Sequence, residues 1–245
     1  MMLETRGLTK RFGAFTALSG VSVGIRAGAL TSVIGPNGAG KSTFFNLVSG
    51  ALAPSAGEIL FEGRAITGTK QHRFAALGIA KSFQITNVFP QLTALENVRV
   101  AAQALAAGLD PWRPRARLQG LVEQAHALLA TVGLADRATA RAATLAHGQQ
   151  RALEIAMALA SRPRLLLMDE PTAGMSPEET RTVMDLILRL ATERTVVLVE
   201  HKMKLVMGIS DRLLVLHHGE LLAEGTPDDI RANDEVRRVY LGQRH

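Results

Sequence analysis

The apolar run ALTSVI (29–34) leads directly into GPNGAGKST (35–43), and this junction constrains the chain more than any other feature. A short apolar strand followed by GxxxxGK[ST] and then by a helix is the context of a phosphate-binding loop. Glycines let consecutive backbone N–H groups turn toward phosphate oxygens, and the helix N-terminus adds a positive partial charge. The candidate phosphate-binding residues are Gly35, Pro36, Asn37, Gly38, Ala39, Gly40, Lys41, Ser42 and Thr43.

Two side chains of this loop have distinct expected roles. Lys41 is expected to reach the β- and γ-phosphates of a nucleotide, and the Ser42 hydroxyl is suited to bind Mg²⁺. The loop alone does not separate ATPases, GTPases and kinases. A GTPase is disfavoured because the chain contains no [NT]KxD sequence for base recognition.

A second apolar run ends in two acids, as LLLMDE (165–170). On a parallel strand whose carboxyl end faces the ligand, Asp169 would emerge beside the phosphates and bind Mg²⁺, directly or through water. Glu170 could orient or deprotonate the attacking water. The alternative, an acidic strand end that caps the next helix, loses weight beside a phosphate loop. The two segments together predict nucleotide hydrolysis.

Composition excludes several other classes. The chain has 245 residues, 28 Lys and Arg against 22 Asp and Glu, a net charge of +6, and no cysteine. Disulfide scaffolds, thiolate metal sites and cysteine nucleophiles are therefore excluded. The positive excess could favour anionic partners or simply give a basic surface. With neither an apolar run of ~18 residues nor a signal-peptide core, we expect an intracellular protein that does not span a membrane.

The order of predicted elements indicates an α/β fold. Two antiparallel strands are expected over 3–26, and βαβ signals run from 164 to 216. Between them, residues 93–133 have a helical pattern that the prolines of PWRPR (111–115) interrupt. We expect one domain over 1–245, with an α/β nucleotide-binding core at about 1–90 and 160–245 and a helical subdomain at about 90–160.

With these motifs in place, nearly the whole chain resembles the ATP-binding subunit of ABC transporters. The resemblance implies a P-loop NTPase fold of ABC type, with an antiparallel β subdomain and an inserted helical subdomain. It implies that Phe12 stacks on adenine, a role that suits an aromatic face. It also implies that Gln84, after IAKSF (79–83), is the catalytic Q-loop glutamine that touches Mg²⁺ and the attacking water and senses the permease.

Two further motifs of that family are present in altered form. Leu145-Ala-His-Gly-Gln149 stands where the family usually has LSGGQ, here called the signature, so Gly148 and Gln149 are implied to contact a γ-phosphate held by an opposite subunit. His201, after the strand at 195–199, matches the histidine that bridges the γ-phosphate and Glu170. In the D-loop, PTAGMS (171–176), the family usually has Asp at the position of Ser176.

Finer matches resemble the longer of two ATPase subunits of branched-chain amino acid uptake systems. They are LAHGQQR (145–151), EPTAGMSP (170–177), HKMKLVMGISDR (201–212) and EGTPDDIRANDEVRRVYLG (224–242). ATPases for urea, amide or aromatic-acid uptake and for lipopolysaccharide export share much of this pattern. Two different classes also stay open: a nucleotide-binding module that does not turn over, and a soluble ABC ATPase acting on nucleic acid.

The resemblance carries a set of partners. These are two membrane permease subunits, a second homologous ATPase subunit or a self-dimer with ATP, and indirectly a solute-binding protein, with no nucleic acid. The place of action would be the cytoplasmic face of the inner membrane, with ATP and Mg²⁺ bound. Phe89, Leu92, Leu95 and Val98 are either a groove for the permease or plain core. Trp112 with Arg113, Arg115 and Arg117 could touch lipid headgroups or a permease loop, or be a solvated loop.

Overall fold

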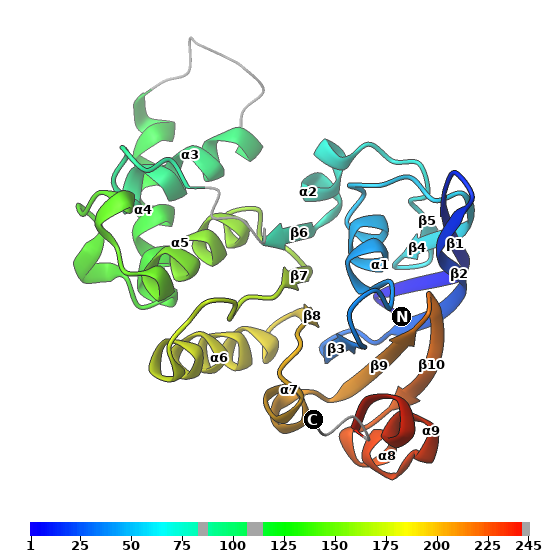
Figure 1. The fold of residues 1–245 in the computed structure, drawn as a ribbon. Helices are drawn as coiled ribbons and strands as arrows, with labels where there is room; N and C mark the ends of the chain where they lie inside the picture. Colours follow the sequence, from blue (N-terminus) through cyan, green and yellow to red (C-terminus); the bar gives the residue numbers. More distant parts are fainter. Residues whose placement is uncertain (83–87, 107–114, 242–245) are drawn as a thin grey trace. The chain divides into compact units, whose positions relative to one another are not determined.

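The computed structural model describes residues 1–82, 88–106 and 115–241 (Figure 1). They divide into two compact units: unit 1 has residues 1–74, 167–170 and 188–245, and unit 2 has residues 75–166 and 171–187. The subdomain boundaries expected near residues 90 and 160 stay a prediction. Among the described residues, no helix is both long enough and apolar enough to cross a membrane.

Unit 1 holds most of the strands and the C-terminal helices. Its elements are β1 (Leu3–Phe12), β2 (Phe15–Ile25), β3 (Leu30–Ile34), α1 (Lys41–Val48), β4 (Ala56–Phe61), β5 (Arg64–Ala65), the 3₁₀ turn Gln71–Arg73, β8 (Thr195–Val199), α7 (Met203–Ile209), β9 (Arg212–His217), β10 (Glu220–Gly225), α8 (Pro227–Ala232), α9 (Asp234–Val236) and the π-helical turn Arg237–Leu241.

Unit 2 is mainly helical. It contains β6 (Ile79–Ser82), α3 (Ala94–Ala106), α4 (Arg115–Thr131), the 3₁₀ turns Ala135–Arg137 and Ala142–Thr144, and α5 (His147–Leu159). The division between the units falls within α2 (Phe74–Leu77), β7 (Leu165–Asp169) and α6 (Pro177–Ala191). Helices α3, α4 and α5 pack against one another, and buried side chains such as Val98, Leu129 and Leu153 form their core.

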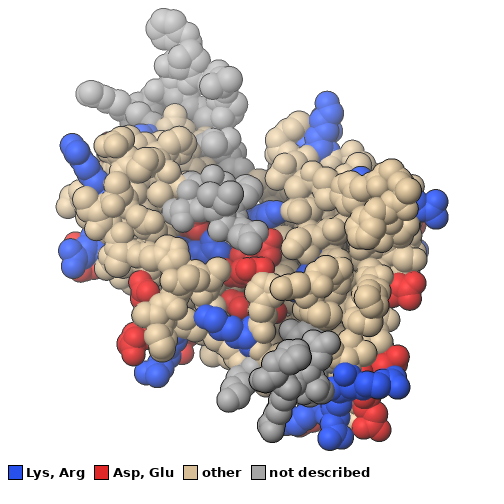
Figure 2. All heavy atoms as spheres, viewed as in Figure 1, with Lys and Arg blue, Asp and Glu red and all other residues tan. Residues whose placement is uncertain are grey.

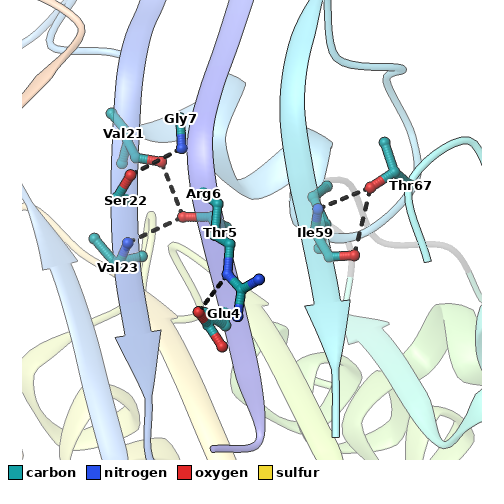
Figure 3. Close-up of polar contacts among 9 residues, drawn as sticks. All are labelled: Glu4, Thr5, Arg6, Gly7, Val21, Ser22, Val23, Ile59 and Thr67. Carbon is teal, nitrogen blue, oxygen red and sulfur yellow. Dashed lines mark hydrogen bonds and ion pairs between the residues drawn. The ribbon is translucent and has the colours of Figure 1, made fainter. Parts of the chain in front are cut away.

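An antiparallel sheet of order β2-β1-β4-β5 forms one layer of unit 1 (Figure 1). The expected pairing of the first two strands is confirmed, from Leu3 opposite Ile25 to Phe12 opposite Phe15. The register slips between Thr5 and Leu8, where Gly7 adopts φ 57°. The buried Thr5 hydroxyl supplies hydrogen bonds between the two strands at this irregularity. It donates to the Val21 carbonyl and accepts from the Val23 N–H (Figure 3).

A second sheet of unit 1 has the order β10-β9-β3-β8-β7, with β3 parallel to both β8 and β9. Every residue of β3, β7 and β8 is buried, as the apolar runs predict for parallel strands covered on both faces. Helix α1 contacts β2 of the first sheet and β8 of the second, so it lies between the two layers. This packing holds the start of α1 close to the strand ends.

One strand was not predicted from the sequence. Strand β10 is absent from the predicted elements because its sequence ELLAEG is short, charged and only partly buried at a sheet edge. Helix α5 begins at His147, and the Gln149 side chain caps the helix start because it accepts a hydrogen bond from the Ala146 N–H.

The C-terminal helices α8 and α9 carry charged side chains of both signs. Figure 2 shows basic and acidic side chains side by side in the region of α8 and α9. This C-terminal segment contains the i,i+3 ion pairs Arg231–Asp228 and Arg237–Asp234. Exposed pairs of this kind contribute little to stability. This part of the surface is therefore a solvated face of mixed charge.

Candidate functional site

The loop between β3 and α1 wraps around the ammonium group of Lys41. Lys41 Nζ donates to the carbonyl oxygens of Gly35, at 2.8 Å, and Pro36, at 2.9 Å. The side chain is 5% exposed, and burial lowers its pKa although the carboxylates of Glu170 and Asp169 oppose that shift. Carbonyl dipoles and two acids thus hold a buried cation at the start of α1, where it is available to an anion.

Close packing explains the glycines at the two ends of this loop. A Cβ on Gly35 would lie 2.2 Å from the Leu216 carbonyl oxygen, and one on Gly40 would lie 2.8 Å from that of Ala17. Gly40, the N-cap of α1, has φ 97°, which L side chains rarely adopt. The loop therefore reaches the α1 N-terminus only with glycine at both positions.

The two acids at the end of β7 differ in burial and backbone. Asp169 is 4% exposed. Glu170 has φ 45°, a strained region for a residue with a side chain, and its N–H donates to the Val199 carbonyl at 2.9 Å. Strained backbone persists where the surrounding structure enforces it, commonly at functional sites. The bond to Val199 joins the ends of β7 and β8.

His201, just beyond β8, meets Glu170 at that junction. Its Nε2 lies 2.5 Å from Glu170 Oε1, and the side chains are 45% and 17% exposed respectively. The backbone N–H of His201 also donates to Oε2 of Glu200, a buried acid, at 3.2 Å. The imidazole is therefore held at the carboxylate that the sequence nominated as the base.

A pocket of about 350 Å³ opens over these groups. Residues 37–43, from the phosphate loop and the start of α1, line it together with Phe15, Ala17, Glu170 and His201. Unit 1 alone thus brings together a buried lysine, a helix N-terminus, two hydroxyls and a carboxylate–imidazole pair. Such a set can bind phosphate groups and activate a water molecule beside them.

The aromatic residue that lines this pocket is Phe15. Phe12, nominated from the sequence, lies opposite it across the β1–β2 hairpin, is 48% exposed, and has the Lys10 ammonium 5.1 Å from its ring centroid. Phe15 is 65% exposed. Sequence reasoning missed Phe15, although its cross-strand pairing with Phe12 could have nominated both.

The signature belongs to unit 2. The Gly148 N–H at the start of α5 donates to Oε1 of Glu179 at 2.9 Å, and Gln149 caps the same helix. Glu179 was not among the site residues predicted from the sequence. The S-x-x-E spacing of Ser176-Pro-Glu-Glu179, which is typical of a capping box, could have indicated it. His147 is exposed, and its Cε1 would lie 3.5 Å from a Cβ placed on Gly174 of the D-loop.

Other nominated residues have different outcomes. Gln84, Trp112 and Arg113 lie outside the described residues, as do the side chains of Arg115 and Arg117. Val98 is fully buried and belongs to the core, whereas Phe89 is 51% exposed. The buried Asn97 holds Phe89 by accepting from its N–H at 2.7 Å and donating to its carbonyl at 3.1 Å.

A strand–phosphate loop–helix junction with Glu170 and His201 in one pocket defines a P-loop nucleotide hydrolase, here of the ATP-binding cassette class. The profile of the ABC transporter family matches residues 18–173. A second profile, for the branched-chain amino acid ATP-binding cassette transporter, matches residues 220–245. The chain belongs to the ABC transporter family as its ATP-hydrolysing subunit, which confirms the resemblance read from the motifs.

The similarity to known relatives extends over nearly the full length of the chain. The chain is 43% identical to the high-affinity branched-chain amino acid transport ATP-binding protein BraF of Pseudomonas aeruginosa, over 99% of this chain and 98% of that protein. The ADP conformation of MJ1267, an ATP-binding cassette of an ABC transporter, superposes with TM-score 0.88 at 30% identity and 99% coverage of both chains. A dimeric post-hydrolysis state of the cassette MJ0796, bound to ADP and Pi, has TM-score 0.77 at 27% identity, over 92% of this chain and 99% of that one.

Proposed function

We propose that this chain is the ATP-hydrolysing subunit that energises a membrane permease for the import of branched-chain amino acids. The observation that carries the hydrolysis is the convergence of Lys41, Glu170 and His201 on one pocket. The solute class is supported by the similarity to BraF and by the profile matched at residues 220–245. This solute class also fits the subfamily motifs of the sequence, such as LAHGQQR (145–151) and EPTAGMSP (170–177).

Mg²⁺ is the metal that the donor set of the pocket suits. Mg²⁺ is usually bound through one or two carboxylates and the substrate phosphates rather than by a dedicated protein cage. Ser42 and Asp169 would bind the ion, with Gln84 added from its sequence position, and the ion would neutralise phosphate charge.

The chain's own groups divide the work of hydrolysis. Lys41 and the N–H groups at the start of α1 bind and orient the phosphates. Glu170 accepts a proton from water, and His201 holds the Glu170 carboxylate while facing the γ-phosphate. Phe12 and Phe15 together would form the platform on which adenine stacks.

Two such subunits would enclose two ATP molecules, with Gly148 and Gln149 of each signature facing the γ-phosphate of the other. The dimeric structure of the cassette MJ0796 supports the pairing of two subunits. The second subunit is either a homologous ATPase or another copy of this chain. Two permease subunits would hold the pair at the cytoplasmic face of the inner membrane and receive substrate from a solute-binding protein.

Reconstitution of the complete transporter in lipid vesicles tests the proposal. Labelled leucine should accumulate only with Mg·ATP, whereas urea and an aromatic acid should not. Uptake of urea or an aromatic acid in place of leucine would overturn the solute class. ATP hydrolysis that is absent in the complete complex would overturn the energising role itself.

A further inference from the structure

One carboxylate of unit 2 bridges the starts of two helices. Glu179 Oε2 accepts from the Ser176 N–H at 3.1 Å, and the Ser176 hydroxyl accepts from the Glu179 N–H at 3.2 Å, which completes a capping box at α6. The other oxygen, Oε1, accepts from the Gly148 N–H at 2.9 Å. A capping box needs only one carboxylate oxygen, so the bond to Gly148 exceeds what α6 requires.

The packing and charge around this contact are closely matched. A Cβ on Gly148 would lie 3.2 Å from Cγ and 3.3 Å from Oε1 of Glu179, so glycine lets the acid approach. The hydrogen bonds from Gly148 and Ser176 lower the pKa of Glu179, and His147 adds to the shift, so the group is an anion at neutral pH. An internal anion therefore binds the N–H assigned above to a phosphate.

We propose that Glu179 is a positioning residue that holds the signature N–H of Gly148 and must be displaced when the γ-phosphate of a nucleotide on the partner subunit binds there. A carboxylate and a phosphate cannot share one N–H without repulsion, so part of the binding free energy of ATP is spent on the exchange. The bridge also ties the D-loop, through Ser176, to the signature, so the exchange releases both segments together. This inference rests on the two-subunit arrangement proposed above.

Glu179→Gln separates this role from plain helix capping. Glutamine serves as well as glutamate in a capping box. It has a single acceptor oxygen and no charge, so it cannot cap α6 and hold Gly148 together. Glu178→Gln is the matched control, because Glu178 is the preceding acid on the same turn, is exposed, and changes the net charge equally.

Two measurements decide the proposal. Hydrogen exchange of the Gly148 amide, followed by NMR on the full chain, should quicken at least about tenfold in Glu179→Gln and stay unchanged in Glu178→Gln. In the complete transporter, Glu179→Gln should lower the KM for ATP about three- to tenfold with kcat within about twofold, because a competing charged hydrogen bond is lost.

Each outcome has a clear meaning. Equal KM values for Glu179→Gln and Glu178→Gln, or an unchanged Gly148 exchange rate, would overturn the proposal and leave Glu179 as a helix cap. A raised KM would show instead that Glu179 helps the phosphate site, which also overturns it. If the wild-type transporter hydrolyses no ATP, the proposed function is wrong. The proposed competition between Glu179 and the γ-phosphate for the Gly148 N–H is then wrong as well.

Discussion

The imidazole of His201 and the carboxylate of Glu170, 31 positions apart in the chain, lie with Nε2 2.5 Å from Oε1. The contact depends on the backbone, because the N–H of Glu170 bonds to the carbonyl of Val199, two residues before His201. The ends of β7 and β8 therefore hold both side chains at the pocket. Glu170 has a φ of 45° at this junction.

Replacing Lys41 tests the phosphate loop. Lys41→Ala should weaken Mg·ATP binding by about 2–5 kcal/mol, at least about thirtyfold, because a desolvated phosphate loses its counter-charge. Equilibrium binding of a fluorescent ATP analogue measures this. Lys70→Ala, a change at an exposed position of unit 1, is the control. Unchanged affinity in Lys41→Ala would remove the loop from phosphate binding.

The role of Glu170 is separable from binding. Glu170→Gln should keep ATP affinity within about threefold while lowering kcat about 10²- to 10⁴-fold, since an amide does not take the proton of water. Single-turnover hydrolysis and ATP binding are measured on the same preparation. Near-normal turnover would assign the base elsewhere, with the neighbouring Asp169 and Glu200 as the first residues to test.

The His201 contact predicts a loss confined to the chemical step. His201→Ala should slow hydrolysis about 10- to 100-fold, the equivalent of one charged hydrogen bond of about 1.5–3 kcal/mol in the transition state. ATP affinity should change far less. His72→Ala, at an exposed position of unit 1, should leave both values unchanged. Equal losses of binding and turnover in His201→Ala would indicate a structural histidine.

The contributions of Phe12 and Phe15 to ATP binding can be ranked by substitution. Stacking of a base on an aromatic side chain is worth about 1–3 kcal/mol. Because Phe15 lines the pocket, Phe15→Ala should weaken ATP binding by about fivefold or more, and Phe12→Ala by less. Comparing ATP with inorganic triphosphate isolates the contribution of the base. The reverse ranking would support the assignment of adenine stacking to Phe12.

The altered signature predicts opposite effects at two adjacent positions. His147→Gly should reduce the ATPase rate of the complete transporter by more than Ala146→Ser raises it, because the two departures from LSGGQ occur together. The His147 ring lies near the D-loop, with its Cε1 3.5 Å from a Cβ placed on Gly174. A tenfold gain from Ala146→Ser with no loss from His147→Gly would mean that this half-site is simply weakened.

The sequence by itself determined the parts of the protein whose chemistry is contiguous. The phosphate loop needs adjacent glycines, Lys41 and Ser42, and LLLMDE joins a buried strand to its acids, so local pattern suffices for both. The apolar runs of β3, β7 and β8 indicated buried parallel strands for the same reason. These features were enough to predict nucleotide hydrolysis, and the family followed from the resemblance of further motifs such as the signature.

Only the tertiary structure decided which distant groups meet. Strand pairing put Phe15 rather than Phe12 at the pocket wall, and it brought His201 to Glu170, a contact that the residues alone did not predict and only the family resemblance implied. Helix packing brought the second oxygen of Glu179 to the Gly148 N–H. These contacts depend on register and side-chain direction across elements far apart in the chain, and a local pattern carries no such information. The edge strand β10 escaped prediction because its pairing with β9, rather than its own composition, makes it a strand.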